Sequence, residues 1–247
     1  DKILKKMESD AQTWNDLLWC SGGKLELPKC SYHSLTFIPQ PDGSTKPNMD
    51  KHQTDLILTD SETGTLIPIT AKTANESHRT LGHWKAPADP KQTTQLKHLT
   101  TRAQLIATLI HMANLSRFGA TIAYHGVYLA TLKYVLPQCF FQPLALQKAE
   151  RATTPLIVSK CGYNRNTAIA LRYAPLHHAG CGFIKWQTLQ GEGQIILFLK
   201  HWRTYSMVSR ILRIAIAWTQ WQSGISTSIL RDTNTSLPHL SSRWITS

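Results

Sequence analysis

The sequence predicts an α+β protein in which a small part, with one helix and antiparallel strands, precedes a mainly α-helical part. Apolar residues recur at helical spacing over residues 2–19, and short alternating segments separated by turn residues occupy residues 24–87. Helical spacing then returns at residue 91 and continues to residue 222. These three observations place the boundary between the two parts near residue 90.

The first part begins with a predicted helix over residues 2–19, because its apolar side chains share one face. Gly22 and Gly23 end this helix. The segment KLELPKCSYHSLTF, residues 24–37, predicts a strand pair or a strand–turn–strand, with Pro28 at an edge or bulge. The remaining expected elements are a turn-rich loop at 38–48 around Asp-Gly, strands at 55–59 and 65–70 joined by a Ser-Glu-Thr-Gly turn, and a short strand within 77–87.

The second part is predicted to be a series of helices separated by short turns. The longest spans residues 91–117, and its apolar stripe comprises Leu96, Leu99, Ala103, Ile106, Ile110 and Ala113. The other expected helices cover residues 119–135, 142–160, 166–173, 184–205 and 207–222. A Ser/Thr-rich tail follows from Gly224 and is expected to be loose.

Charge is distributed very unequally between the two parts. Residues 1–90 hold 10 Lys and Arg and 12 Asp and Glu, whereas residues 91–247 hold 17 Lys and Arg and only 3 Asp and Glu. This asymmetry favours a polyanion as the partner of the second part. A basic surface that serves only solubility is the alternative.

Cys30 and His33 have the spacing of a metal-ligand pair, and Cys20 lies ten residues before Cys30. A structural zinc site needs four ligands, and the other Cys/His cluster is the distant HHAGC segment, residues 177–181. On a regular strand, Cys30 and His33 would also point to opposite faces. The sequence therefore disfavours zinc at this pair.

Catalytic constellations are weak in this chain. Cys161 or Cys181 could pair with His177 or His178, but no nucleophile elbow or orienting acid accompanies them. No two acidic residues are adjacent, so a two-metal carboxylate cluster is not expected within this chain. The segment GEG, residues 191–193, lacks the strand and the length of a phosphate-binding loop.

No membrane segment and no signal peptide are expected. The most apolar window, QIILFLKHWRTYSMVSRILRIAIAW, is interrupted by four cations: Lys200, Arg203, Arg210 and Arg213. Five cysteines without a tight repeat fit reduced thiols, and hence an intracellular protein of the nucleus or cytoplasm.

Basic residues in the second part are the strongest positive signal, because cations at intervals along helices can follow a phosphate backbone. The candidates are Lys91, Lys97, Arg102, Arg117, Lys148, Arg151, Lys160, Arg165 and Arg172. A segment that includes His201, Trp202, Arg203 and Tyr205 mixes cations with aromatics. We expect the tryptophans of this region (Trp202, Trp218 and Trp221) to belong to the core, as most tryptophans do.

Three segments, DAQTWNDLLWCSGGKLELPKCSYH, RTLGHWKAP and YAPLHHAGCGF, together resemble the downstream part of a non-LTR retrotransposon-type reverse transcriptase. Leu25 to Cys30 is similar to the fourth palm motif, with Lys29 at the motif lysine. Thr80-Leu81-Gly82 resembles the primer-grip strand, with Thr80 in place of its aromatic residue. PLHHAGCGF resembles a Pro-Leu-x-x-Gly-Gly-x-Gly-Phe turn, with Ala179 replacing the first Gly.

The resemblance implies a fragment of an RNA-directed DNA polymerase. Residues 1–90 would be the C-terminal edge of the palm, residues 91–160 thumb-like helices, and residues 161–247 a helical connector with a loose tail. Lys29 would be catalytic, as a cation near the departing pyrophosphate that donates a proton or stabilises charge. Leu81 and Gly82 would belong to the primer grip.

The partners implied are an RNA template with its DNA primer and the upstream fingers and palm portion of the same polyprotein. In the intact enzyme, Mg²⁺ would be bound by upstream aspartates that this chain does not contain, so the chain alone should bind nucleic acid and polymerise nothing. One alternative is a stand-alone basic nucleic-acid-binding or scaffold protein. Another is a zinc or thiol enzyme.

Overall fold

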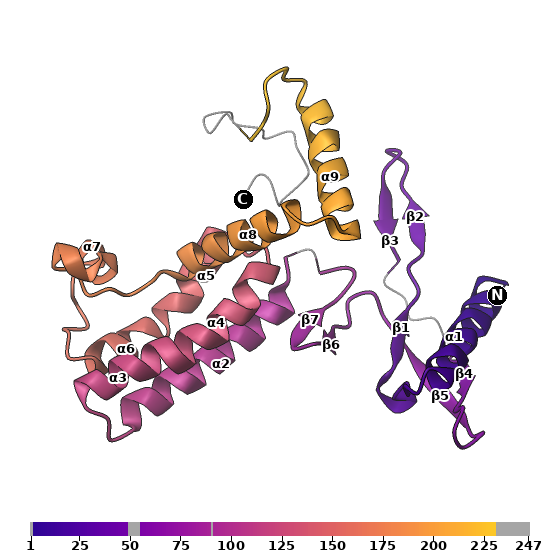
Figure 1. Ribbon diagram of the computed structural model, residues 1–247, viewed down its shortest axis with the longest axis horizontal. Coiled ribbons are helices and arrows are strands. Elements are labelled where there is room, and N and C mark those ends of the chain that lie inside the picture. Colours follow the sequence, from indigo (N-terminus) through magenta and orange to yellow (C-terminus); the bar gives the residue numbers. More distant parts are fainter. Residues whose placement is uncertain (1, 49–54, 90, 231–247) are drawn as a thin grey trace. The chain divides into compact units, whose positions relative to one another are not determined.

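The computed structural model describes residues 2–48, 55–89 and 91–230. It divides the chain into two compact units, Asp1–Pro90 and Lys91–Ser247. In Figure 1 the colours follow the sequence from indigo at the N-terminus to yellow, and the bar gives the residue numbers. In its described part, the first unit combines one long helix with small sheets and the second unit is helical, which confirms the predicted α+β class. The division falls where the charge composition changes.

The first unit is built on helix α1 (Lys2–Cys20) and a three-stranded sheet. The strands of the whole unit, in its described part, are β1 (Ser31–His33), β2 (Phe37–Pro39), β3 (Thr45–Pro47), β4 (Leu56–Thr59), β5 (Leu66–Lys72), β6 (His78–Thr80) and β7 (His83–Lys85). The sheet has the order β1-β5-β4, in which β1 runs parallel to β5 and β4 runs antiparallel to it. The pairs β2–β3 and β6–β7 are separate antiparallel hairpins.

Helix α1 packs against one face of the three-stranded sheet. The register places Leu56 opposite Ile69 and Leu58 opposite Ile67, so alternate side chains of β4 and β5 point to the same side. A small core forms there from the buried residues Leu27, Leu56, Leu58 and Ile69, with Leu4, Met7 and Ala11 packed against them. The predicted helix over residues 2–19 is therefore confirmed as the apolar cover of this sheet.

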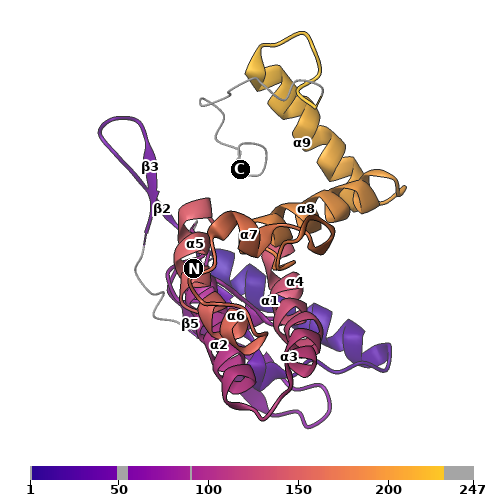
Figure 2. The ribbon, with the colours of Figure 1, turned by 90° about the vertical axis from the view of Figure 1, so that its left-hand side faces the viewer.

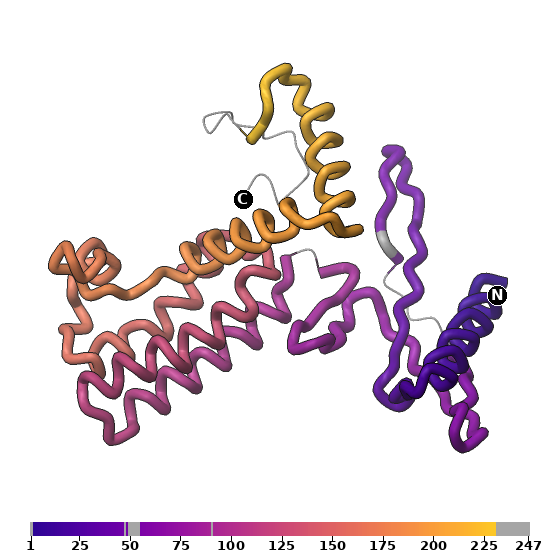
Figure 3. Tube along the Cα trace, viewed as in Figure 1, coloured from indigo at the N-terminus to yellow at the C-terminus, as the bar shows by residue number. Residues whose placement is uncertain are grey.

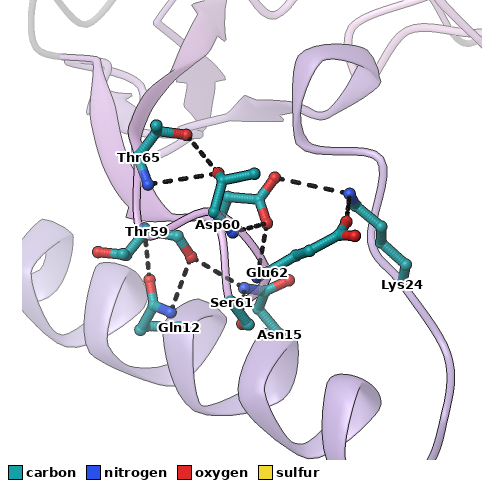
Figure 4. A network of polar contacts seen from close by, with 9 residues as sticks. Gln12, Asn15, Lys24, Thr59, Asp60, Ser61, Glu62 and Thr65 are labelled. Atoms are coloured by element: carbon teal, nitrogen blue, oxygen red, sulfur yellow. Dashed lines mark hydrogen bonds and ion pairs between the residues drawn. The ribbon is translucent and has the colours of Figure 1, made fainter.

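Side chains of α1 also close the outer edge of β4 (Figure 4). The Gln12 Oε1 atom accepts a hydrogen bond from Thr59 N (2.8 Å), and Gln12 Nε2 donates to Thr59 O (3.1 Å). Asn15 Nδ2 donates to the same carbonyl oxygen at 3.0 Å. Glu8 Oε1 accepts from Ile57 N at 3.0 Å. Because these edge groups are paired, they cannot recruit another strand.

The prediction of strands over residues 24–37 is wrong for the first half of this segment. A 3₁₀ turn, Leu27–Lys29, occupies that stretch, and strand pairing begins only at Ser31. Pro28 lies in the first positions of this turn, where its fixed φ and missing N–H are tolerated. Leu27 is only 1% exposed, so its burial in the core outweighs the alternating pattern that favoured a strand.

The prediction of a loop over residues 38–48 is also wrong, because the segments on either side of the central turn pair as strands β2 and β3. The turn between them has Asp42 and Gly43 at its tip, as the Asp-Gly signal indicated. The Asp42 Oδ1 atom accepts from Ser44 N at 2.9 Å, and Gly43 has a φ of 81°. The hairpin predicted around Ser-Glu-Thr-Gly is confirmed as β4 and β5.

Besides two short 3₁₀ turns, the second unit contains eight α-helices and one π-helical segment in its described part. They are α2 (Thr93–Met112), α3 (Arg117–Ala123), a π-helical segment (Tyr124–Leu129), α4 (Ala130–Val135), α5 (Pro143–Arg151), α6 (Thr154–Lys160), α7 (Ile169–Tyr173), α8 (Trp186–Trp202) and α9 (Met207–Ser223). Figure 3 shows α2 beside α4 and α6, and Figure 2 shows α9 leading away from the end of α8. From residue 231 on, the tail predicted to be loose lies outside the described residues.

Two long helices predicted for this unit are interrupted. The helix over residues 91–117 stops where Ala113 becomes extended (φ −64°, ψ 146°), and Ser116 then caps α3 by accepting a hydrogen bond from the backbone of that helix. The helix over residues 142–160 is divided in two before Pro155. Proline lacks an N–H and its ring collides with the preceding turn, so it is tolerated only in the first turn of α6.

The core of the second unit surrounds Trp186, which is only 1% exposed. The Trp186 Nε1 atom donates to Tyr128 Oη at 3.2 Å, and Tyr128 Oη lies 2.6 Å from Thr153 Oγ1. These bonds join the π-helical segment, the α5–α6 junction and the start of α8. The helices expected as two groups, residues 91–160 and 161–247, therefore share a single hydrophobic core in the described part of the chain.

Candidate nucleic-acid interface

The cations predicted to bind nucleic acid lie at the surface of the second unit. Lys91 precedes α2, Lys97 and Arg102 lie on α2, Arg117 begins α3, Lys148 and Arg151 lie on α5, Lys160 ends α6, and Arg165 lies in the loop before α7. All are exposed except Lys160, which is half-buried. Each charged group can therefore be reached by a ligand from solvent.

Positive charge in the second unit is not balanced within that unit. Residues 91–230 contain fifteen Lys and Arg and only two acidic residues, Glu150 and Glu192. Among the residues that the structure describes, ion pairs occur only in the first unit. Unpaired cations repel one another and raise the local concentration of anions. The second unit thus presents a positive surface that an anionic partner would neutralise.

A glycine fixes the position of one of these cations. Gly162 has a φ of 88°, and a Cβ atom placed there would lie 2.5 Å from the Cδ atom of Arg117. The missing side chain lets the aliphatic part of Arg117 lie across the end of α6.

In the first unit, charge has a structural role (Figure 4). The Lys24 Nζ atom lies 3.8 Å from Asp60 Oδ2 and also pairs with Glu62. The Asp60 Oδ1 atom accepts from Glu62 N at 2.8 Å, a bond that lowers the pKa of the Asp60 carboxyl group. These contacts stabilise the turn between β4 and β5.

Lys29, the predicted catalytic residue, is the last residue of the 3₁₀ turn and is exposed. Its backbone N–H donates to Glu26 O at 2.9 Å, which fixes the backbone, and its ammonium group has no ion-pair partner among the described residues. The neighbouring Cys30 is half-buried against the small core, and burial raises the pKa of its thiol. The turn thus separates an accessible cation from a packed thiol.

Leu81 and Gly82, the predicted primer-grip residues, are the two central residues of the turn between β6 and β7. Their φ values are 49° and 85°, and positive φ at both positions is typical of a type I′ turn. Residues 77–87 therefore form a hairpin and not the single strand predicted. Leu81 is 85% exposed, and a left-handed backbone costs a residue other than Gly about 1–2 kcal/mol.

The elements that carry Lys29 and Leu81 are connected. The Ser31 Oγ atom lies 3.2 Å from His78 Nδ1, which joins β1 to β6. Lys29 precedes Ser31 by two residues, and Leu81 follows His78 by three. One side-chain contact therefore links the strand that follows the predicted palm motif to the strand that precedes the predicted primer-grip turn.

Cys30 and His33 make separate contacts. The Cys30 Sγ atom donates to Glu26 O at 3.5 Å, and the His33 Nδ1 atom lies 3.1 Å from Thr73 O. In the described ranges, no three His, Cys, Asp or Glu residues come together in a way that could hold a metal ion. Burial raises the pKa of the Cys161 thiol, which disfavours a thiolate there.

The PLHHAGCGF segment forms a tight turn that returns the chain from α7 to α8. Ala179 has a φ of 57°, a conformation that favours the Gly found at this position of the resembled motif. A Cβ atom on Gly180 would lie 2.0 Å from Ala174 O, so only glycine fits there. Gly182 N donates to the same carbonyl oxygen at 3.0 Å. The glycines of this motif therefore have a structural role in the second unit.

The GEG segment is not a loop, because residues 191–193 lie within α8. A Cβ atom on Gly193 would lie 2.3 Å from Pro137 Cγ, so this glycine allows α8 to approach the end of α4 closely.

Sequence reasoning also missed two residues beside the predicted cations, Tyr173 and Lys185. An aromatic residue at the end of a helix and a cation at the start of the next were available as a signal.

The prediction that the late tryptophans belong to the core is wrong for two of them. Trp218 and Trp221 are 57% and 72% exposed. Trp202 is half-buried, and its ring centre lies 4.3 Å from the Arg213 guanidinium carbon. Helical spacing identifies the apolar side of α9, but it does not show whether another element covers that side. The tryptophan at the centre of the core is Trp186.

Comparison of the chain with protein-family models, curated proteins and solved structures finds no match. Within the described residues, none of the helices combines the length and the apolar character needed to cross a bilayer.

Proposed function

We propose that the second unit binds a nucleic-acid duplex through its phosphate backbone, as the thumb of a non-LTR retrotransposon-type reverse transcriptase. The supporting observation is that the exposed cations of this unit form no ion pair with any acidic residue that the structure describes. Cations of this kind release condensed counterions when they contact phosphates, which drives binding with little dependence on base sequence.

The first unit, in this proposal, is the C-terminal edge of the palm. Lys29 lies near the pyrophosphate that departs during nucleotide addition, where its ammonium group donates a proton or stabilises charge. Leu81 and Gly82 contact the primer from the turn between β6 and β7. The accessible ammonium group of Lys29 and the exposed, left-handed Leu81 support these roles.

Polymerisation requires Mg²⁺, and the described residues of this chain do not supply a donor set that fits it. The chain would obtain its metal-bound catalytic centre from the upstream fingers and palm portion. Purified chain added to a primed RNA template with deoxynucleotides and Mg²⁺ should therefore incorporate nothing. Nucleotide incorporation by the chain alone would contradict the proposal that it is a fragment.

Binding is tested by titrating the chain into a labelled RNA–DNA hybrid at increasing salt. The logarithm of the association constant should fall linearly with the logarithm of salt concentration, with a slope of about −0.9 for each phosphate neutralised on a B-form duplex. The Lys97→Gln and Arg102→Gln variants should each lower that slope in magnitude. The matched control, Lys24→Gln, removes a cation that is already paired in the first unit. An affinity that does not change with salt would exclude binding through phosphates.

A stand-alone basic nucleic-acid-binding protein is the second candidate, supported by the same unpaired cations. The two candidates differ in what they predict for Lys29. Joined to an upstream portion that carries the catalytic aspartates, the chain should support primer extension, and Lys29→Ala should slow extension while duplex affinity stays the same. A stand-alone binding protein would show no extension in either form.

A further inference from the structure

The second unit contains a pocket of about 280 Å³, near the lower limit of the volumes typical of ligand sites. Its walls come from four elements: α5, α6, α7 and the start of α8. Pro143, Leu144 and Ile169 give it an apolar side. We call it the cationic pocket, because three basic side chains also line it: Arg151, Arg172 and Lys185.

The cationic pocket carries an excess of positive charge. Glu150 is the single acidic residue among those that line it, so three cations face one carboxyl group. None of the three cations forms an ion pair with a described residue. Burial raises the pKa of Glu150. Because three cations face one carboxyl group, an anion in the pocket would meet net attraction.

Contacts position two of the three cations, Arg172 through hydrogen bonds and Lys185 through an aromatic ring. The Arg172 Nη2 atom donates to the carbonyl oxygens of Arg165 (2.8 Å) and Thr167 (3.2 Å). The Lys185 Nζ atom lies 5.2 Å from the centre of the Tyr173 ring. Fixed cations lose little conformational freedom when a ligand binds.

The acidic group of the pocket is equally constrained. Tyr173 Oη donates to Glu150 Oε1 at 2.6 Å, and Trp186 N donates to Glu150 Oε2 at 3.4 Å. Glu150 thereby ties α5 to α7 and to the first residue of α8. The three elements that carry the pocket cations are thus joined through one buried side chain.

We propose that the cationic pocket binds a phosphomonoester, either the terminal phosphate of a nucleic-acid strand or a free nucleoside monophosphate. A phosphomonoester carries about −1.5 to −2 charges at pH 7, which matches three cations and one carboxyl group better than the single charge of an internal phosphodiester does. A pocket enclosed by four elements also suits a strand end better than a continuous strand. The apolar side then contacts the sugar and base. This inference rests on the proposed function for its nucleic-acid source.

The test compares two labelled RNA–DNA hybrids of the same sequence, one with a DNA strand that ends in a phosphate and one with a DNA strand that ends in a hydroxyl group, by fluorescence anisotropy with the full chain. The phosphorylated hybrid should bind roughly tenfold more tightly, because charge-assisted hydrogen bonds contribute about that factor. Lys185→Gln and Arg151→Gln should abolish the preference; both replaced side chains are exposed. The control Lys97→Gln, on α2 outside the pocket, should weaken binding of both hybrids equally and keep the preference.

A titration with a nucleoside monophosphate separates the two sources of the phosphate. One outcome is that the nucleotide binds, that Lys185→Gln abolishes this binding, and that neither hybrid binds. This outcome would support the pocket as a free-nucleotide site and contradict the proposed function. Salt-dependent binding of both hybrids with equal affinity would overturn the pocket inference and leave the proposed function standing. Absence of binding to all three ligands would overturn both.

Discussion

The two units of this chain differ in whether any of their described Lys and Arg side chains form ion pairs. In the first unit, Lys24 pairs with Asp60 and Glu62 beside a core of only a few buried residues. In the second unit, a much larger core surrounds Trp186, and no described Lys or Arg is ion-paired. The difference teaches that a unit stabilised by apolar burial can leave its cations unpaired at the surface. Those cations are then available to a ligand.

The strongest way to test this contrast is to remove the centre of the larger core. Trp186→Ala should lower the free energy of unfolding of the second unit by about 3–5 kcal/mol, because it leaves a cavity and removes one of the hydrogen bonds of the Tyr128 hydroxyl. Urea denaturation followed by circular dichroism measures this loss. Trp221→Ala is the matched control, since its side chain is 72% exposed, and it should change the free energy by less than about 0.5 kcal/mol. Equal losses would mean that the core is not organised around Trp186.

In the first unit, an edge hydrogen bond should matter more than a surface charge. Gln12→Ala removes both side-chain bonds to Thr59 and should cost about 1–2 kcal/mol. Amide hydrogen exchange at Thr59 should accelerate in this variant. Asp10→Ala, an exposed change on the same helix, should leave that exchange rate unchanged. An unchanged rate in Gln12→Ala would show that α1 does not close the β4 edge.

The acidic residue of the cationic pocket predicts a pH dependence confined to the second unit. Because burial raises the folded-state pKa of Glu150, stability is fully present below the ordinary Glu pKa of about 4.3 and falls as pH rises through the folded-state pKa. Glu150→Gln should therefore stabilise the unit at pH 7 by on the order of 1 kcal/mol and have little effect at pH 4. Thermal unfolding at both pH values measures the difference. A destabilised variant at pH 7 would show that the ionised carboxylate is the favoured form.

The smallest expected effect lies in the turn that follows α7. Ala179→Gly should stabilise the second unit by about 0.5–1 kcal/mol, since relief of the left-handed backbone exceeds the added freedom of the unfolded chain. Ala168→Gly, at a φ of −51°, is the control and should destabilise by a similar amount. Thermal unfolding compares the two variants. The same sign for both would argue against strain at Ala179.

Local patterns predicted the elements better than their ends. The helix over residues 2–19 and the β4–β5 hairpin follow from periodicity and a turn signal, and both are confirmed. The helix over 91–117 stops early, and Leu27 takes a 3₁₀ turn, because packing in each core outweighs propensity. The predicted roles of Lys29 and of the surface cations remain predictions.

The sequence by itself determined the α+β class, the boundary at residue 90 and the excess of positive charge after it, because composition and short-range spacing encode these properties. Only the tertiary structure gathered Arg151, Arg172 and Lys185 around Glu150. That arrangement depends on a turn in which Gly180 approaches Ala174 O too closely for any side chain. It also depends on contacts between residues tens of positions apart, such as Glu150 with the start of α8. No local pattern specifies such contacts, since they form only when the core brings separate helices together.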